Sequence, residues 1–212
     1  MANQNRFPIA LELFELGHEF IEGKTVFDGI STEIQAGSHV IINGRNGSGK
    51  STLGKILAGQ LTATKGSLAW KQNKQVIEPA ALLQQSSYTG PSATLHPYMS
   101  IHEILEFHSK FRSWRDEVDP RDWMKEAGLG LYMDVLFSEL SSGMKQRVLL
   151  TVSLCTQSSL VVLDEPCANL DRSGIDWYQK QLTKFPTNTT LVICTNDRSE
   201  DFIKVDKRIE LA

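Results

Sequence analysis

The sequence predicts an α/β fold in which a parallel sheet with covering helices is interrupted by a mostly helical subdomain. Short apolar runs at residues 40–42, 158–163 and 190–194 have the composition of buried strands. From residue 100 to about residue 140 the apolar residues recur at helical spacing. Strands that alternate with helices at both ends of the chain, around a helical middle, favour an interrupted α/β core.

The N-terminal part of the chain adds a second kind of sheet. Residues 9–13 and 29–34 alternate roughly at period two, and residues 66–70 with 75–77 resemble a β-hairpin. These segments predict an N-terminal antiparallel β subdomain. The expected division is a single domain over residues 1–212, with the core and its β subdomain at 1–90 and 155–212 and a helical subdomain at about 91–154.

Two helix starts can be read from capping residues in the middle of the chain. Ser100 is followed by Glu103 at capping-box spacing, so a helix should begin directly after Ser100. Asp119 precedes Pro120, and proline is favoured at the first helical position. A further helix is expected after Ser142. These starts place most of the helical subdomain.

Composition restricts the class of protein. The chain has 212 residues, 41% hydrophobic and 22% charged, with a formal net charge of −3. The negative charge gives no support for a nucleic-acid-binding face, so no nucleic acid partner is expected. No apolar run approaches the roughly 20 residues that span a bilayer, and residues 1–6 have no apolar signal core behind them. The three widely spaced cysteines fit buried roles in a reducing cytosol.

The segment from Gly44 to Ser51 matches the phosphate-binding loop G-x-x-x-x-G-K-S, between a strand-like run and a helix-like segment. Glycines let backbone N–H groups turn toward phosphate oxygens, and the helix points its positive end at the same anion. Lys50 can reach the β- and γ-phosphates, as a binding and catalytic group, and Ser51 can ligate Mg²⁺. The expected nucleotide-binding residues of this loop are Asn46, Gly47, Ser48, Gly49, Lys50, Ser51 and Thr52.

Two acids, Asp164 and Glu165, follow the apolar run that ends at residue 163. Alone, an apolar strand that ends in two acids is more often a plain turn. After a phosphate-binding loop in the same chain, it favours a Walker B element. Asp164 would then hold Mg²⁺, and Glu165 would polarise the attacking water as general base.

Small residues precede a helix a second time at residues 140–147, Leu-Ser-Ser-Gly-Met-Lys-Gln-Arg. Exposed backbone N–H groups, the hydroxyl of Ser141 and the helix dipole can make another anion site there. Taken alone, the segment is more often a simple helix N-cap. As an anion site, it gives the chain two phosphate sites and one set of catalytic acids.

The three motifs, in this order and spacing, resemble the nucleotide-binding subunits of ATP-binding cassette (ABC) transporters over about residues 13–211. The signature of that family is usually L-S-G-G-Q and here reads Leu-Ser-Ser-Gly-Met at residues 140–144. The resemblance implies a RecA-like P-loop NTPase core with a helical subdomain, and hydrolysis of ATP with Mg²⁺. It also implies a head-to-tail dimer, in which Ser141 and Gly143 of one subunit contact ATP held by the other.

The resemblance further implies partners and a location. A second nucleotide-binding subunit, expected to be an identical chain, completes the dimer, which drives a separate integral membrane permease. The chain would lie in the cytoplasm, on the inner face of the membrane. Residues 88–100 and the helical subdomain are the expected docking surface, although Leu95, Tyr98 and Met99 can equally pack the subdomain itself.

Two more positions are carried over from the family one at a time. Phe20 lies about 24 residues before Gly44, where an aromatic ring usually stacks on adenine. A plain core role is the alternative for Phe20. Residues 168–171, Ala-Asn-Leu-Asp, fit the D-loop, which places Asp171 at the contact between subunits.

Two positions depart from the family pattern. Pro91 stands where a glutamine that contacts Mg²⁺ and the attacking water is expected, and Gln84 and Gln85 lie upstream. Asn196 replaces a histidine that holds the γ-phosphate, and its amide can donate a hydrogen bond but cannot transfer a proton. Losing one hydrogen bond of the transition state costs about 3 kcal/mol. We therefore expect an active but slow ATPase, with Asn196 as a candidate catalytic residue.

Narrower and alternative functions stay open. The short chain and the Tyr-x-Gly segment at residues 88–90 resemble the ATPase of the cytochrome c maturation haem exporter. The alternative is a soluble or regulatory ABC-type ATPase with low or no turnover. The single cassette and the absence of sustained heptads argue against the soluble types, and Glu165 argues against a purely regulatory subunit. The transported substance and its direction are left open.

Overall fold

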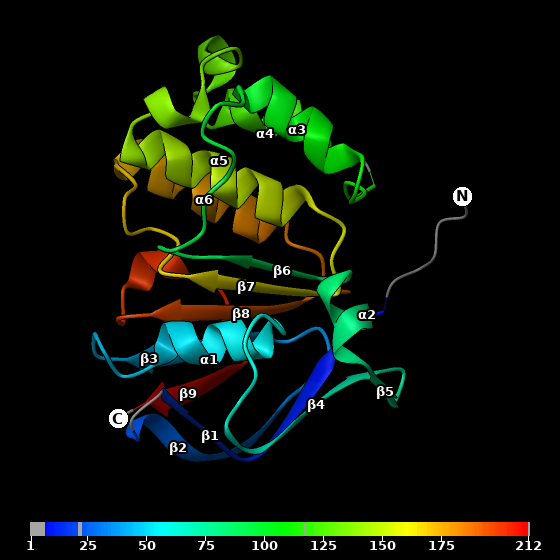
Figure 1. The fold of residues 1–212 in the computed structure, drawn as a ribbon. Helices are drawn as coiled ribbons and strands as arrows, with labels where there is room; N and C mark the ends of the chain where they lie inside the picture. The colour runs from blue at the N-terminus through cyan, green and yellow to red at the C-terminus, as the bar shows by residue number, and fades with distance from the viewer. Residues whose placement is uncertain (1–6, 21–22, 117, 212) are drawn as a thin grey trace.

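Two sheets form the framework of the molecule (Figure 1). The computed structural model describes residues 7–20, 23–116 and 118–211, so the expectation about residues 1–6 lies outside the described residues. Five parallel strands have the order β6-β7-β8-β3-β9, and four antiparallel strands have the order β2-β1-β4-β5. The bounds are β1 Ala10–Phe20, β2 Lys24–Ile34, β3 His39–Gly44, β4 Lys65–Gln72, β5 Gln75–Ile77, β6 Ser86–Thr89, β7 Leu160–Asp164, β8 Thr190–Thr195 and β9 Lys207–Leu211.

The apolar runs predicted as buried strands form the centre of the parallel sheet. Every residue of β7 and β8 is buried, because helices or a second sheet cover both faces. Val161 contributes to the hydrophobic cluster on one face, and Leu160 and Val162 contribute to the cluster on the other. The hairpin of β4 and β5 is also present, with Trp70 opposite Ile77. The predicted α/β class and its antiparallel subdomain are confirmed.

The helices begin where the capping residues predict. Ser100 accepts a hydrogen bond from the backbone N–H of Glu103, whose carboxylate accepts one from Ser100 in return. Asp119 caps the next helix, with Pro120 at its first position. The helix bounds are α1 Lys50–Leu57, α2 Pro79–Leu83, α3 Ile101–Ser109, α4 Pro120–Glu126, α5 Ser142–Cys155 and α6 Arg172–Thr183, with short 3₁₀ turns at Gly130–Tyr132, Phe137–Glu139 and Ser199–Asp201.

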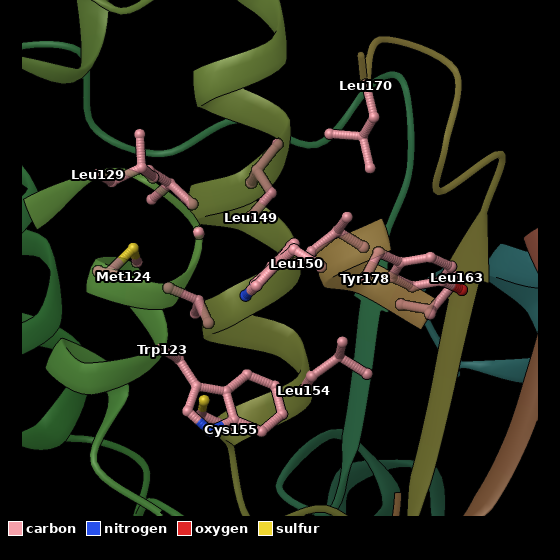
Figure 2. Close-up of a cluster of buried hydrophobic side chains, with 14 of the residues drawn as sticks. Trp123, Met124, Leu129, Leu149, Leu150, Leu154, Cys155, Leu163, Leu170 and Tyr178 are labelled. Atoms are coloured by element: carbon pink, nitrogen blue, oxygen red, sulfur yellow. The ribbon is translucent and has the colours of Figure 1, made fainter. Parts of the chain in front are cut away.

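The elements stack in layers on the parallel sheet (Figure 1). Helices α5 and α6 cover one face with α3 and α4 outside them, and α1 and the antiparallel sheet cover the other. Figure 2 shows part of the first cluster, where Leu150 and Leu154 of α5 lie between Trp123 of α4 and Tyr178 of α6. Each fully buried side chain of this size stabilises the fold by about 1.5–3 kcal/mol.

The structure shows the surroundings of the three cysteines and of two apolar residues in the expected docking segment. Cys155, Cys167 and Cys194 are buried free thiols, in agreement with the buried roles predicted for them. Burial raises the pKa of the Cys194 thiol well above its ordinary value. Leu95 and Met99 pack against the helical cluster, so internal packing accounts for both.

Of the three apolar or aromatic residues named for the docking segment, Leu95, Tyr98 and Met99, Tyr98 is exposed at the surface. Tyr98 is 75% exposed and therefore stays a docking candidate. No helix in the described ranges combines the length and the apolar character that crossing a membrane requires.

Candidate functional site

The phosphate-binding loop connects β3 to α1, as the motif requires. Gly47 and Gly49 have φ values of 86° and 93°, which favour glycine and turn the backbone N–H groups inward. A Cβ atom on Gly49 would also lie 2.6 Å from Cγ1 of Val26, so glycine is required there. Lys50 is buried, and its Nζ donates to the carbonyls of Gly44 and Arg45 at 2.7 and 2.9 Å. The side chain of Lys50 therefore bonds back to the loop that precedes it.

A cavity of about 520 Å³ opens over this loop. Phe20 is 52% exposed at its edge, which matches adenine stacking better than a core role. Ser48 does not line the cavity, and its buried Oγ lacks a hydrogen-bond partner in the described ranges. The predicted residues that line the cavity are Phe20, Asn46, Gly47, Gly49, Lys50, Ser51, Thr52 and Glu165.

The predicted metal residues have the chemistry that Mg²⁺ requires. Asp164 is 1% exposed, and its Oδ2 accepts a hydrogen bond of 3.0 Å from the Tyr88 hydroxyl. Its Oδ1 is buried and has no partner among the residues that the structure describes. A buried carboxylate oxygen without a partner, together with the Ser51 hydroxyl in the cavity, fits a hard cation with oxygen ligands.

Asn196 joins the general-base candidate to the phosphate-binding loop. Its amide Nδ2 donates to Glu165 Oε1 at 3.0 Å and to Asn46 Oδ1 at 2.5 Å. Because a carboxylate only accepts hydrogen bonds, the NH₂ group of Asn196 must face Glu165. Glu165 itself has φ 48°, an uncommon value for a residue other than glycine that concentrates at functional sites. Residues from three segments of the chain therefore meet beside the cavity, which Asn46 and Glu165 line.

The signature residues lie in a different cavity. Ser141 caps α5 by accepting from the backbone N–H of Met144, and Gly143 and Asp171 line the same hollow of about 370 Å³. This cavity shares no lining residue with the one over the phosphate-binding loop. The three signature and D-loop candidates are thus brought together, apart from the other site residues.

Asp171 is held within its own chain. It caps α6, and the backbone N–H of Gly174 is the main cause of the lowered pKa of its carboxyl. Arg147 of α5 also donates to Asp171 and to Ser173. The sequence analysis did not identify Arg147, although it closes the signature segment at residues 140–147.

The two glutamines upstream of Pro91 lie before the start of β6. Gln85 accepts a hydrogen bond from Gln72 and precedes β6, whereas Asp164 lies at the carboxyl end of β7. Because β6 and β7 are parallel, the start of β6 and the carboxyl end of β7 lie at opposite ends of the strand pair. Tyr88 contacts Asp164 instead, and the sequence analysis missed it. Its position near the end of a short polar strand is the only sequence signal for this contact.

A glycine loop between a parallel strand and a helix, beside two acids that end a neighbouring strand, defines a P-loop nucleotide-binding protein. Known proteins agree with this class. Residues 27–168 match the family described as ABC transporter. Among solved structures, a putative ABC transporter ATP-binding protein from Pyrococcus furiosus has the same fold, with TM-score 0.77 and 21% identity, over 95% of this chain and 97% of that one.

Curated relatives narrow the class to one family. The chain is 32% identical over 152 residues to the cytochrome c biogenesis ATP-binding export protein CcmA of Chelativorans sp. (strain BNC1), over 72% of this chain and 74% of the relative. It is 26% identical to the spermidine/putrescine import ATP-binding protein PotA of Mycoplasma capricolum subsp. capricolum, over 93% of this chain and 57% of that relative. The chain belongs to the ATP-binding domains of the ABC transporter family.

Proposed function

We propose that this chain is the ATP-hydrolysing subunit of an ABC transporter, with Glu165 as general base. The observation that carries the proposal is the hydrogen-bonded set of Glu165, Asn196 and Asn46, of which Glu165 and Asn46 line the cavity over the phosphate-binding loop. Glu165 takes the proton of the attacking water, while Asn196 fixes the carboxylate and donates toward the reaction centre. Lys50 leaves its two loop carbonyls to contact the β- and γ-phosphates.

The proposal includes a magnesium ion. When bound, Mg²⁺ supplies neutralisation of charge on the β- and γ-phosphate oxygens. Ser51 and Asp164 are the residues that would hold it, the latter through Oδ1. Phe20 provides an exposed ring for the adenine base.

A second nucleotide-binding subunit, an identical chain, completes the active site in this proposal. The separate cavity of Ser141 and Gly143 supports this arrangement, because it presents a helix N-terminus for phosphate away from the cavity of Lys50. In a head-to-tail pair of chains, the Lys50 cavity of each chain faces the Ser141 cavity of the other, which gives two equivalent sites.

The proposed assembly also contains a separate membrane permease. The chain would dock on its cytoplasmic side, and the exposed Tyr98 is the docking candidate. The nucleotide cavities carry groups for adenine, phosphate and metal. We therefore assign the choice of cargo to the permease, in line with the different transport roles, export and import, in the names of the relatives.

The proposal is tested by changing Glu165→Gln, which keeps the size of the side chain and removes the base. We expect ATP hydrolysis, measured as phosphate release, to fall by about a hundredfold or more, since general-base catalysis contributes 10²- to 10⁴-fold. Binding of a fluorescent ATP analogue should persist.

The matched control for this test is Glu106→Gln, an exposed glutamate on α3. It should hydrolyse ATP at the rate of the unaltered chain. If the unaltered chain has no more turnover than Glu165→Gln, even with its permease, hydrolysis is excluded and a regulatory subunit is the better description.

A further inference from the structure

We propose that Tyr88 is the positioning residue for the magnesium site, acting through Asp164. The inference rests on the proposed function, since it concerns the metal that accompanies ATP. Tyr88 would not contact the metal itself. Its hydroxyl would hold one oxygen of the Asp164 carboxylate, and that carboxylate would contact the metal.

The hydrogen bond from Tyr88 gives the two carboxylate oxygens of Asp164 different surroundings. Tyr88 donates to Oδ2 at 3.0 Å, while Oδ1 is buried without a partner in the described part of the chain. A hydrogen bond to one oxygen restricts rotation of the carboxylate about its last bond, so Oδ1 keeps a preferred direction. A group that orients a metal-binding side chain typically changes metal affinity by about 10- to 100-fold.

Strand pairing and helix packing hold the ring of Tyr88. In the parallel register of β6 and β7, Tyr88 lies opposite Val162, two residues before Asp164. Its ring packs on the hydrophobic cluster below the sheet, and a Cβ on Gly54 of α1 would lie 3.6 Å from Cε2 of Tyr88. The hydroxyl is thus carried by a ring that contacts the helix of the phosphate-binding loop.

The backbone after β6 closes over the same pair. A Cβ atom on Gly90 would lie 2.7 Å from the Tyr88 hydroxyl and 2.8 Å from Cβ of Asp164. Only a residue without a side chain can therefore sit there while the hydrogen bond is intact. The side chain of Ser92 also interacts with the Tyr88 hydroxyl. The loop after β6 therefore lies against both Tyr88 and Asp164.

The test compares nucleotide binding with and without the metal. The affinity of the full-length chain for the fluorescent analogue N-methylanthraniloyl-ATP is measured in Mg²⁺ and in EDTA. The ratio of the affinity in Mg²⁺ to that in EDTA gives the contribution of the metal. Tyr88→Phe keeps the ring and removes the hydroxyl. We expect the ratio to fall about tenfold while the affinity in EDTA stays unchanged.

Two further variants complete the design. Tyr178→Phe removes a buried hydroxyl that donates to the Asp201 carbonyl in another part of the fold, and should leave the ratio unchanged. Gly90→Ala crowds both the Tyr88 hydroxyl and Asp164, and should lower the ratio at least as far as Tyr88→Phe does. If Tyr88→Phe does not fold, Tyr88→Met, which also lacks the hydroxyl, carries the test.

The outcomes separate the two proposals. An unchanged ratio in Tyr88→Phe, or equal losses in Mg²⁺ and EDTA, overturns the positioning role and leaves the proposed function intact. If the unaltered chain binds the analogue equally well in Mg²⁺ and EDTA, the proposed metal site fails and the positioning role fails with it. An unaltered chain that does not bind the analogue overturns the proposed function itself.

Discussion

Asn196 illustrates how one amide can join two segments that are 31 and 150 residues away from it in sequence. Its two N–H groups suit the carboxylate of Glu165 and the side-chain oxygen of Asn46, which both accept. An amide does not titrate near neutral pH, so its contribution is orientation and a fixed dipole. The site therefore positions Glu165 without a second titrating group.

This reading predicts the effect of Asn196→Asp. The new side chain has the same shape but donates no hydrogen bond, and its charge repels Glu165. We expect ATP hydrolysis to fall by about 10²- to 10³-fold, the usual cost of losing one donor at a reaction centre. Phosphate release measures this, with Asn196→His as the matched variant. A rate for Asn196→His equal to or below that of the unaltered chain would argue against the view that Asn196 is a weaker substitute for the family histidine.

Single residues differ in how far the sequence predicts them. The phosphate-binding loop, Asp164 and Glu165 are predictable because their chemistry imposes fixed spacings in one stretch of chain. The contact of Tyr88 with Asp164 depends on the register between β6 and β7, which no local pattern encodes. Arg147 likewise acquires its partners only when α5 packs beside α6.

At the scale of elements, Arg147 connects three helices. Its guanidinium donates to the carbonyl of Ala127 after α4 at 2.6 Å and to Asp171 and Ser173 at the start of α6. The side chain is 14% exposed, so solvent screens these bonds only partly. A planar group with five donors suits this branching contact. The signature helix is thus anchored to its neighbours at the end that faces the second cavity.

We expect Arg147→Ala to lower the free energy of unfolding by about 2 kcal/mol, because hydrogen bonds from a charged donor are lost. Urea unfolding of the purified chain measures the change. The control is Arg172→Ala, whose pair with Asp176 is exposed on both sides and should contribute less than about 0.5 kcal/mol. Equal losses in the two variants would contradict the anchoring role.

His108 makes a second connection between elements, from α3 to the end of α5. Its ring stacks on Trp114 at 4.6 Å between centroids, and Nε2 lies 2.8 Å from the hydroxyl of Thr156. Burial, with a smaller contribution from the charge of Arg112, lowers the pKa of His108 to about 4. The folded protein therefore keeps this imidazole neutral in mildly acidic solution.

The sign of the resulting pH dependence follows from linkage. Between its ordinary pKa of 6.5 and the folded pKa of about 4, His108 is protonated in the unfolded chain only. Stability from this group is full above pH 6.5 and is lost as the pH falls toward 4. We expect His108→Gln to lose less stability between pH 7 and pH 5 than the unaltered chain, as measured by urea unfolding at about these pH values. The exposed His96→Gln should keep the original slope.

The elements themselves were unequally predictable. Buried strands β7 and β8 and the capped helices α3 and α4 follow from composition and caps. Strand β6 has only four residues, Ser-Ser-Tyr-Thr, and α2 only five, so neither presents a full period of apolar residues. The sequence analysis also left α6 and β9 unassigned. Both owe their place to packing on strands that are distant in sequence.

At the scale of the whole molecule, one chain carries two cavities that share no residue. In the proposed pair of chains, each active site takes its base from one copy and its signature from the other. A defect in either half is therefore repaired by a partner that carries the other defect. Genetics can detect this as complementation between two inactive alleles.

Glu165→Gln removes the base, and Ser141→Asp keeps the cap of α5 while placing a negative charge against phosphate. Each should be inactive alone. Co-expressed in equal amounts, they should recover about a quarter of normal ATPase activity, because half of the pairs are mixed and each mixed pair has one unaltered site. Activity no greater than the sum of the two parents would mean that each chain works by itself. If cells that depend on the transporter grow only when they carry both inactive alleles, a growth assay detects the separation of the two cavities.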